Sequence, residues 1–261
     1  MMDFQKILYN VQEKIAFITL NTPKNLNSFD DVMLDEIVSA LHHADEDNEV
    51  KVIVLNSSSP AFSGGGDVRA MYEGVKSNNL DFNTSIEKMA SVSLTMKQIS
   101  KPVIASVSGA VAGAGFNVAL AADFIIASED AFFIQSFVNI GLIPDAGGIF
   151  LLSRAVGVNK ATELVMTGKP VSASQGKELG FVSNIVPTEE LEAATNKLAK
   201  SLAYGPSLAY AEIKKLVFES DFKGFEEYVK QEVKSQVACS ETADFVEGIS
   251  AFAEKRKPKF N

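Results

Sequence analysis

Two glycine-rich segments, each following a run of apolar and β-branched residues, constrain the fold of this chain more than any other feature. Residues 63–67, Ser-Gly-Gly-Gly-Asp, follow the run 50–55, and the second segment, residues 109–115, follows the run 103–107. Runs of this composition bounded by glycine are typical of buried strands, and helix candidates follow both segments. Strand, glycine turn and helix recurring in this order predict an α/β fold with parallel strands joined by right-handed crossovers.

The rest of the first two thirds of the chain continues this pattern. A hairpin is predicted over residues 7–12 and 14–20, and Ser28 is predicted to cap the helix that follows it. Further strands are predicted over residues 124–127 and 181–186, and further helices over residues 86–99, 149–155, 160–167 and 173–179.

From about residue 189 the sequence predicts amphipathic helices with no strands between them. They cover residues 191–204, 207–218, 222–237 and 243–254. We therefore expect two parts, a core of residues 1–188 and a helical region of residues 189–261. Amphipathic helices appended to a core often bury their apolar face against another subunit.

Composition and charge exclude several classes of protein. With 24 Lys and Arg against 33 Asp and Glu, the formal net charge is −9, which argues against a nucleic-acid surface. A single cysteine, Cys239, cannot form an internal disulfide, and two adjacent histidines, His42 and His43, leave no scope for a His-rich metal site. The most apolar stretch, residues 103–127, is interrupted by glycine, Asn and Asp, and the N-terminus lacks a signal-peptide pattern. We expect a cytoplasmic protein that binds neither nucleic acid nor membrane.

The glycine segments are candidates for holding a negative charge. The second segment opens a helix, where unpaired N–H groups and the helix dipole favour an anion. One backbone donor from each segment would form an oxyanion hole, which suits a thioester whose carbonyl oxygen gains charge when an adjacent carbon loses a proton. Each segment taken alone is equally consistent with a plain turn.

Five motifs in order resemble the crotonase, or enoyl-CoA hydratase/isomerase, superfamily. They are Ala61-Phe62-Ser63-Gly64-Gly65-Gly66-Asp67, the run from Lys101-Pro102 to Gly115, Ile140-Gly141-Leu142-Ile143-Pro144-Asp145-Ala146-Gly147-Gly148, Leu164-x-Met166-Thr167-Gly168, and the ending from Gly248 to Pro258. The resemblance implies a spiral of ββα units with a C-terminal helical trimerisation region. It also implies an acyl-CoA or acyl-carrier-protein substrate, a trimer or dimer of trimers, and neither a metal nor any cofactor beyond the pantetheine thioester. The oxyanion donors would be the backbone N–H groups of Gly66 and Ala114.

Departures from the family's hydratase pattern indicate the reaction. The two glutamates that hold and activate water in hydratases would fall at Asn117 and Phe137, and neither side chain can transfer a proton as a carboxylate does. Asp145 is retained, and it is similar to the aspartate of the isomerase branches, with the closest resemblance to trans-2-enoyl-acyl-carrier-protein and Δ3-Δ2-enoyl-CoA isomerase-type members. Asp145 is also suited to capping the helix after it.

One carboxylate is enough to move a double bond between C2 and C3 of an enoyl thioester to the next position. It removes a proton at one carbon and returns it at another, by way of a dienolate held in the oxyanion hole. We therefore expect a cofactor-independent isomerase of fatty-acid metabolism. The alternatives are an enoyl-CoA hydratase and a non-catalytic thioester-binding scaffold.

The resemblance also implies a set of substrate-binding residues. These are Lys24, Leu26, Ala61, Gly64, Gly65, Asp67, Val68, Asn117, Phe137, Phe252 and Lys255. Lys24 and Lys255 match positions that often meet the nucleotide end of CoA, although both are equally consistent with solvated surface. Phe252 is a candidate for the acyl end or for the core, and Asn117 for a contact near the thioester or for packing.

Overall fold

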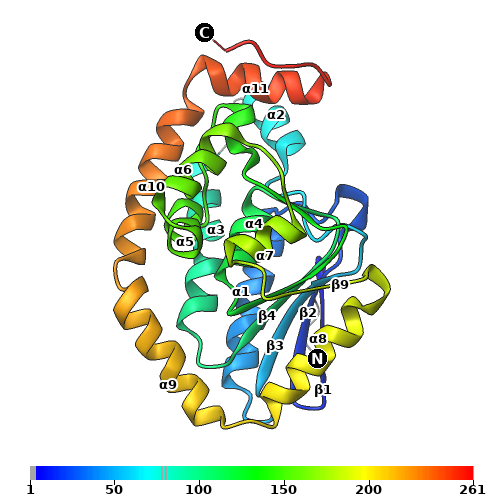
Figure 1. Cartoon of the computed structure of the whole chain (residues 1–261). Coiled ribbons are helices and arrows are strands. Elements are labelled where there is room, and N and C mark those ends of the chain that lie inside the picture. The colour runs from blue at the N-terminus through cyan, green and yellow to red at the C-terminus, as the bar shows by residue number, and fades with distance from the viewer. Residues whose placement is uncertain (1–3, 78, 80, 261) are drawn as a thin grey trace.

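Two sheets form the centre of the protein in the computed structural model, which describes residues 4–77, 79 and 81–260 (Figure 1). The larger sheet has six strands in the order β1-β2-β3-β4-β6-β9 and the smaller has three in the order β5-β7-β8. The strands are β1 (Ile7–Gln12), β2 (Ile15–Leu20), β3 (Val52–Ser57), β4 (Val103–Val107), β5 (Ala110–Ala112), β6 (Phe124–Ser128), β7 (Phe132–Ile134), β8 (Val171–Ser172) and β9 (Asn184–Val186).

The pairing of the larger sheet follows the sequence pattern. β1 and β2 form the expected hairpin, with Ile7 opposite Leu20, and β2, β3, β4, β6 and β9 run parallel. Every residue of β4 is buried, because a parallel strand with helices on both faces has no solvent side. The α/β class and the parallel central strands are therefore confirmed.

The chain alternates between the sheets as a spiral of ββα units. β4 joins the larger sheet and β5 the smaller, and α4 then follows; β6 and β7 repeat the alternation before α5. In the preceding turn of the spiral, Ser63 alone takes the place of a second strand, through a parallel bridge to Val111. Strands of two or three residues carry too little periodicity to be recognised, so the smaller sheet was missed from the sequence.

The helices surround both sheets. They are α1 (Asp31–Glu46), α2 (Val68–Lys76), α3 (Phe82–Gln98), α4 (Ala114–Ala121), α5 (Gly148–Val156), α6 (Val158–Thr167), α7 (Ala173–Leu179), α8 (Leu191–Ala203), α9 (Ser207–Val217), α10 (Phe225–Ser240) and α11 (Ala243–Ala253), with 3-10 turns η1 (Pro23–Asn25), η2 (Ser136–Ile140) and η3 (Thr188–Glu190) and a π-helical turn η4 (Phe218–Phe222). None of the helices in the described ranges is both long and apolar enough to cross a membrane.

The sequence predicts the cap of α7 correctly and the cap of α1 wrongly. Ser172 and Gln175 form the full capping box of α7. The expectation that Ser28 caps α1 is wrong, because Asp30 does so, accepting a hydrogen bond from the Met33 N–H at 2.9 Å. The Ser28 hydroxyl instead donates to the Asn25 carbonyl, closing the turn after η1.

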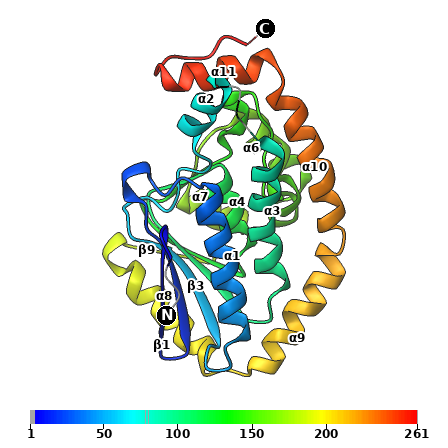
Figure 2. The same ribbon diagram turned by 180° about the vertical axis from the view of Figure 1, so that it is seen from behind.

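The last four helices lie around the core rather than in a separate bundle (Figures 1 and 2). α8 covers one face of the larger sheet, where Ala199 and Ala203 pack against β2, β3, β4 and β6. α10 packs along α3, and α11 packs on α2 and η2. This arrangement brings α2, α3 and η2 together at one end of the molecule, and a mainly apolar cavity opens there.

Candidate active site

A cavity of about 460 Å³ lies between α1, α2, α3 and the segment after η2. Its walls are mainly apolar and include Phe29, Val32, Leu34, Met71, Phe82, Ile86, Met89, Phe137, Ile140 and Leu142. Both glycine segments reach it, through Gly64, Gly66, Gly113 and Ala114. A concave apolar cavity with a few convergent polar groups is the usual form of a small-molecule site.

The structure pairs the two glycine segments. Besides the bridge from Ser63 to Val111, the backbones approach so closely at Gly65 that an added Cβ would lie 2.7 Å from the Ala112 carbonyl oxygen. Gly65 also has a φ of +89°, which favours glycine. Gly66 and Ala114, one from each segment, line the cavity, and the backbone N–H group of neither donates to another of the described residues. Two unpaired donors thus lie beside one cavity, a combination that an oxyanion hole requires.

A buried polar network holds the first glycine segment in place. The Asn27 amide, which is fully buried, donates to the Ser57 hydroxyl at 2.7 Å and to the Phe62 carbonyl at 3.2 Å. The Ser63 hydroxyl donates to the Asn27 carbonyl and accepts from the Gly65 N–H. Sequence reasoning missed both residues, because the contacts that join Asn27 to Ser57, Phe62 and Ser63 span 30 to 36 positions.

Asp145 lies at the inner wall of the cavity, in the turn before α5. Its side chain is buried, and among the described residues its Oδ1 has no hydrogen-bond partner. Burial raises the pKa of its carboxyl to about 7. The capping role weighed from the sequence is wrong, because Gly147 is the N-cap of α5 and no side chain caps that helix.

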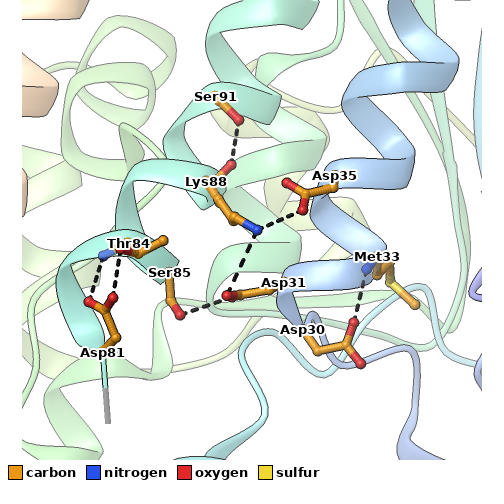
Figure 3. A network of polar contacts seen from close by, with 9 residues as sticks. All are labelled: Asp30, Asp31, Met33, Asp35, Asp81, Thr84, Ser85, Lys88 and Ser91. Carbon is orange, nitrogen blue, oxygen red and sulfur yellow. Dashed lines mark hydrogen bonds and ion pairs between the residues drawn. The ribbon is translucent and has the colours of Figure 1, made fainter.

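Four other carboxylates line the cavity, and each is at least partly exposed and already engaged. Asp30, Asp67 and Asp81 accept hydrogen bonds from backbone N–H groups at the starts of α1, α2 and α3. Asp31 accepts from the Ser85 hydroxyl at 2.9 Å and lies 3.9 Å from the Lys88 ammonium, whose closer partner is Asp35 (Figure 3). Among the described residues, Asp145 is therefore the lining carboxyl that is buried and has an oxygen without a hydrogen-bond partner.

Asn117 contacts the loop of Asp145 from behind and does not line the cavity. Its side-chain N–H donates to the backbone carbonyl of Asp145 at 2.9 Å, and its side-chain oxygen accepts from the Gln135 amide at 2.7 Å. A Cβ on Gly148 would lie 2.4 Å from the Asn117 amide, so the helix after the loop packs closely on it. Of the two roles open for Asn117, the contacts within this chain favour packing.

The other side of the loop rests on α10. Glu232 accepts from the Gly147 N–H at 2.9 Å, and Gln236, one turn later, accepts from the Ile143 N–H at 2.9 Å. Gly147 lies against the Phe225 ring, which is 2.0 Å from where its Cβ would be, and has a φ of +74°. No sequence signal marked Glu232 or Gln236, since both act on residues at least 85 positions away.

The remaining predicted binding residues divide between the cavity and the surface. Gly64, Asp67, Val68 and Phe137 line the cavity, whereas Gly65 and Ala61 do not. Ala61 contributes its carbonyl oxygen, which accepts from the Ser57 hydroxyl at 2.8 Å.

Four further predicted residues also lie away from the cavity. Lys24 and Leu26 lie at the exposed turn η1, where the Leu26 carbonyl accepts from Gly64. Phe252 and Lys255 line a second hollow, of about 610 Å³, between α2 and the end of α11. Phe252 is 59% exposed, which contradicts a core role for it within this chain. Within the ranges that the structure covers, no three His, Cys, Asp or Glu residues are grouped as a metal site would require.

Comparisons with known proteins identify the family of the chain. Residues 10–261 match the family model described as enoyl-CoA hydratase/isomerase. A trans-2-decenoyl-[acyl-carrier-protein] isomerase of Streptococcus mutans is 42% identical over 260 residues, with 99% of each chain covered. A probable enoyl-CoA hydratase of Rhodobacter capsulatus is 36% identical over the same share of both chains. The crystal structure of an enoyl-CoA hydratase from Mycobacterium avium subsp. paratuberculosis superposes with a TM-score of 0.90 at 28% identity, covering 99% of this chain and all of the other.

Proposed function

The chain belongs to the enoyl-CoA hydratase/isomerase family, and on that premise we propose that it is a double-bond isomerase of enoyl thioesters with Asp145 as its base. The observation that carries the proposal is the position of Asp145, a buried carboxyl with an unpartnered oxygen at the wall of a cavity that Gly66 and Ala114, whose N–H groups are unpaired among the described residues, also line. A base, an oxyanion hole and an apolar chamber are the parts that an allylic proton shift needs.

The proposed reaction moves one proton. Ionised Asp145 removes a proton from C4 of a trans-2-enoyl thioester, and the electrons shift toward the carbonyl to give a dienolate. The N–H groups of Gly66 and Ala114 hold the dienolate oxygen, each contributing on the order of 3 kcal/mol of transition-state stabilisation. Asp145 then returns the proton to C2, which leaves the double bond between C3 and C4 and regenerates the carboxylate.

The hydratase alternative lacks its second proton-transfer group. Hydration needs a positioned water and a proton donor in addition to a base. Phe137 lines the cavity with an apolar ring, and the amide of Asn117 is used by Asp145 and Gln135. Neither position supplies the missing acid, so isomerisation is the better-supported reaction.

The substrate we propose is a medium-chain enoyl group carried on a pantetheine thioester of an acyl-carrier protein. Two features support this class: the apolar walls from α1 and α3, which suit an alkyl chain, and the 42% identity to a relative named for a decenoyl-carrier substrate. The roles of the surface residues Lys24, Phe252 and Lys255 in holding the carrier or the CoA nucleotide stay predictions.

We further propose that the protein assembles as a trimer or a dimer of trimers through its C-terminal helices. No residue of α9 is buried within one chain, and Leu208, Ile213 and Leu216 are 76%, 57% and 65% exposed. Exposed apolar patches of this kind mark interfaces. Light scattering should give a mass three or six times the chain mass of 28.1 kDa.

The reaction is tested with trans-2- and cis-3-decenoyl thioesters of carrier protein and of CoA, following their interconversion. Asp145→Asn should lower the rate by about 10²–10⁴-fold, the usual contribution of a general base. Wild-type activity in that variant would exclude Asp145. Rapid 3-hydroxyacyl formation from crotonyl-CoA would instead favour the hydratase, and thioester binding without deuterium exchange at C2 or C4 would favour the scaffold.

A further inference from the structure

A second buried carboxyl, that of Glu232, lies behind the loop that carries Asp145. Glu232 is 3% exposed and belongs to α10, which does not line the cavity. Its Oε1 accepts from the Gly147 N–H, while among the described residues its Oε2 is buried without a hydrogen-bond partner. A carboxyl in such surroundings is costly to ionise, because one backbone donor does not replace its hydration.

The neighbouring Gln236 shows that loop support alone does not need a carboxyl. Gln236 is equally buried and holds the Ile143 N–H at the same 2.9 Å, with a neutral amide oxygen. The two acceptors, one helical turn apart, fix the loop on both sides of Asp145. The difference between them is that Glu232 can gain or lose a charge, which indicates a role beyond the hydrogen bond.

Few other charges act on Glu232. Asp145 repels its ionised form from the loop, and the Tyr228 hydroxyl, on the same helix, acts in the opposite direction and lowers the pKa of Glu232. From α5, the Arg154 guanidinium lies over the Phe150 ring and donates to the Asp221 carbonyl.

Charged residues of α3 and α11, the other two helices packed here, contact other partners or do not shift the pKa of Glu232. Lys88 of α3 pairs with Asp35, and Lys97 of α3 lies over the Phe222 ring. On α11, Glu247 pairs with Arg256, and Asp244 is not among the groups that shift the pKa of Glu232. The carboxyls of Glu232 and Asp145 therefore form a pair whose ionisations are linked.

We propose that Glu232 is a positioning residue for Asp145 that stays protonated while Asp145 works as a base, and that its ionisation in alkaline solution switches the site off. The inference rests on the proposed role of Asp145. Burial and the negative charge of ionised Asp145 both raise the pKa of Glu232, to about 8. While Asp145 is ionised, its charge therefore favours a protonated Glu232, and ionisation of Glu232 would add a second buried negative charge that opposes the negatively charged dienolate.

The test compares kcat/KM from about pH 6 to about pH 10 in the wild type and in Glu232→Gln, which keeps an acceptor oxygen for Gly147 but cannot ionise. The wild type should lose activity above about pH 8, and Glu232→Gln should lose at least tenfold less over the same range. Gln236→Ala is the matched control: it removes the acceptor for Ile143 without changing a titrating group, so kcat should fall while both limbs of the profile stay in place.

A second measurement separates this inference from the proposed reaction and does not need Glu232→Gln to fold. In protein labelled with ¹³C at the glutamate carboxyls, one resonance should titrate near pH 8 in the wild type and move to lower pH in Asp145→Asn, which removes the repelling charge. An unmoved resonance, or an alkaline limb shared by the wild type and Glu232→Gln, would overturn the inference. A wild type without isomerase activity but with the expected titration shift would overturn only the proposed reaction.

Discussion

The side-chain amide of Asn117 donates to the backbone carbonyl of Asp145 at 2.9 Å, so the start of α4 is linked directly to the loop of the proposed base. Asn117 is fully buried and receives the Gln135 amide on its other side. From the sequence, Asn117 was expected either to contact the thioester or to pack in the interior. In the structure it contacts the backbone of Asp145 itself. The contact therefore links α4, the helix that begins at Ala114, to the loop that positions Asp145.

Asn117→Ala should therefore impair catalysis more than binding. The change leaves the Asp145 carbonyl and the Gln135 amide without their partner, at a cost of about 1–3 kcal/mol each for a buried polar group. We expect kcat to fall on the order of tenfold or more while KM changes little. Steady-state kinetics with a decenoyl thioester measures this. A large rise in KM at unchanged kcat would show instead that Asn117 binds substrate.

The rate should depend on pH through Asp145. Its carboxyl acts as a base when ionised, and burial raises its pKa to about 7, so kcat/KM should increase as pH rises from about 5 to about 7. The profile of the free enzyme reports this group directly. Full activity already at about pH 5 would mean that the working base is not this buried carboxyl.

The free energy of unfolding should fall as Asp145 ionises, whereas kcat/KM rises. A carboxyl whose folded pKa lies above its unfolded value destabilises the folded state as pH rises, here between about 3.8 and about 7. At roughly 1.4 kcal/mol per pKa unit, the loss is on the order of 4 kcal/mol. Asp145→Asn should therefore be more stable than the wild type at about pH 8, with the gain vanishing near pH 4, as urea unfolding would measure.

Asp81→Asn is the control, because its effect on folding stability should have the opposite sign. Hydrogen bonds from Thr84 lower the pKa of this exposed carboxyl, so its contribution is present at neutral pH and is lost on acidification. Asp81→Asn should accordingly be slightly less stable than the wild type at about pH 8. The same pH trend in both variants would point to a general charge effect rather than to the burial of Asp145.

Gly147 should not tolerate a side chain. An alanine Cβ would lie 2.0 Å from the Phe225 ring, and the φ of +74° disfavours any residue but glycine. Gly147→Ala should destabilise the protein by about 2 kcal/mol or more and displace Asp145. Gly224→Ala is the matched control near the same aromatic contact, with no atom within 4 Å of the new Cβ and no positive φ. Its unfolding midpoint should differ little from that of the wild type.

Elements that depend on neighbouring residues were predicted well from the sequence. The strand over residues 103–107 and the capped helix over residues 173–179 have the predicted bounds, because β-branched runs, caps and terminal glycines act within a few positions. The smaller sheet was missed, since β5, β7 and β8 have three residues or fewer and exist through pairing with distant segments. Asp30 displaced Ser28 as a helix cap for a similar reason: both residue types suit the position, and the chain's path decides between them.

The amino-acid sequence by itself determined the α/β class, the two glycine segments and the presence of an aspartate before α5, because composition and short-range spacing encode them. The tertiary structure alone decided that the glycine segments meet, that Asp145 is buried rather than capping a helix, and that Glu232 and Gln236 hold its loop. The contacts among them join residues from 48 to 93 positions apart. The free energy that sets these contacts comes from desolvation and hydrogen bonding in a packed interior, and it has no local signature in the chain.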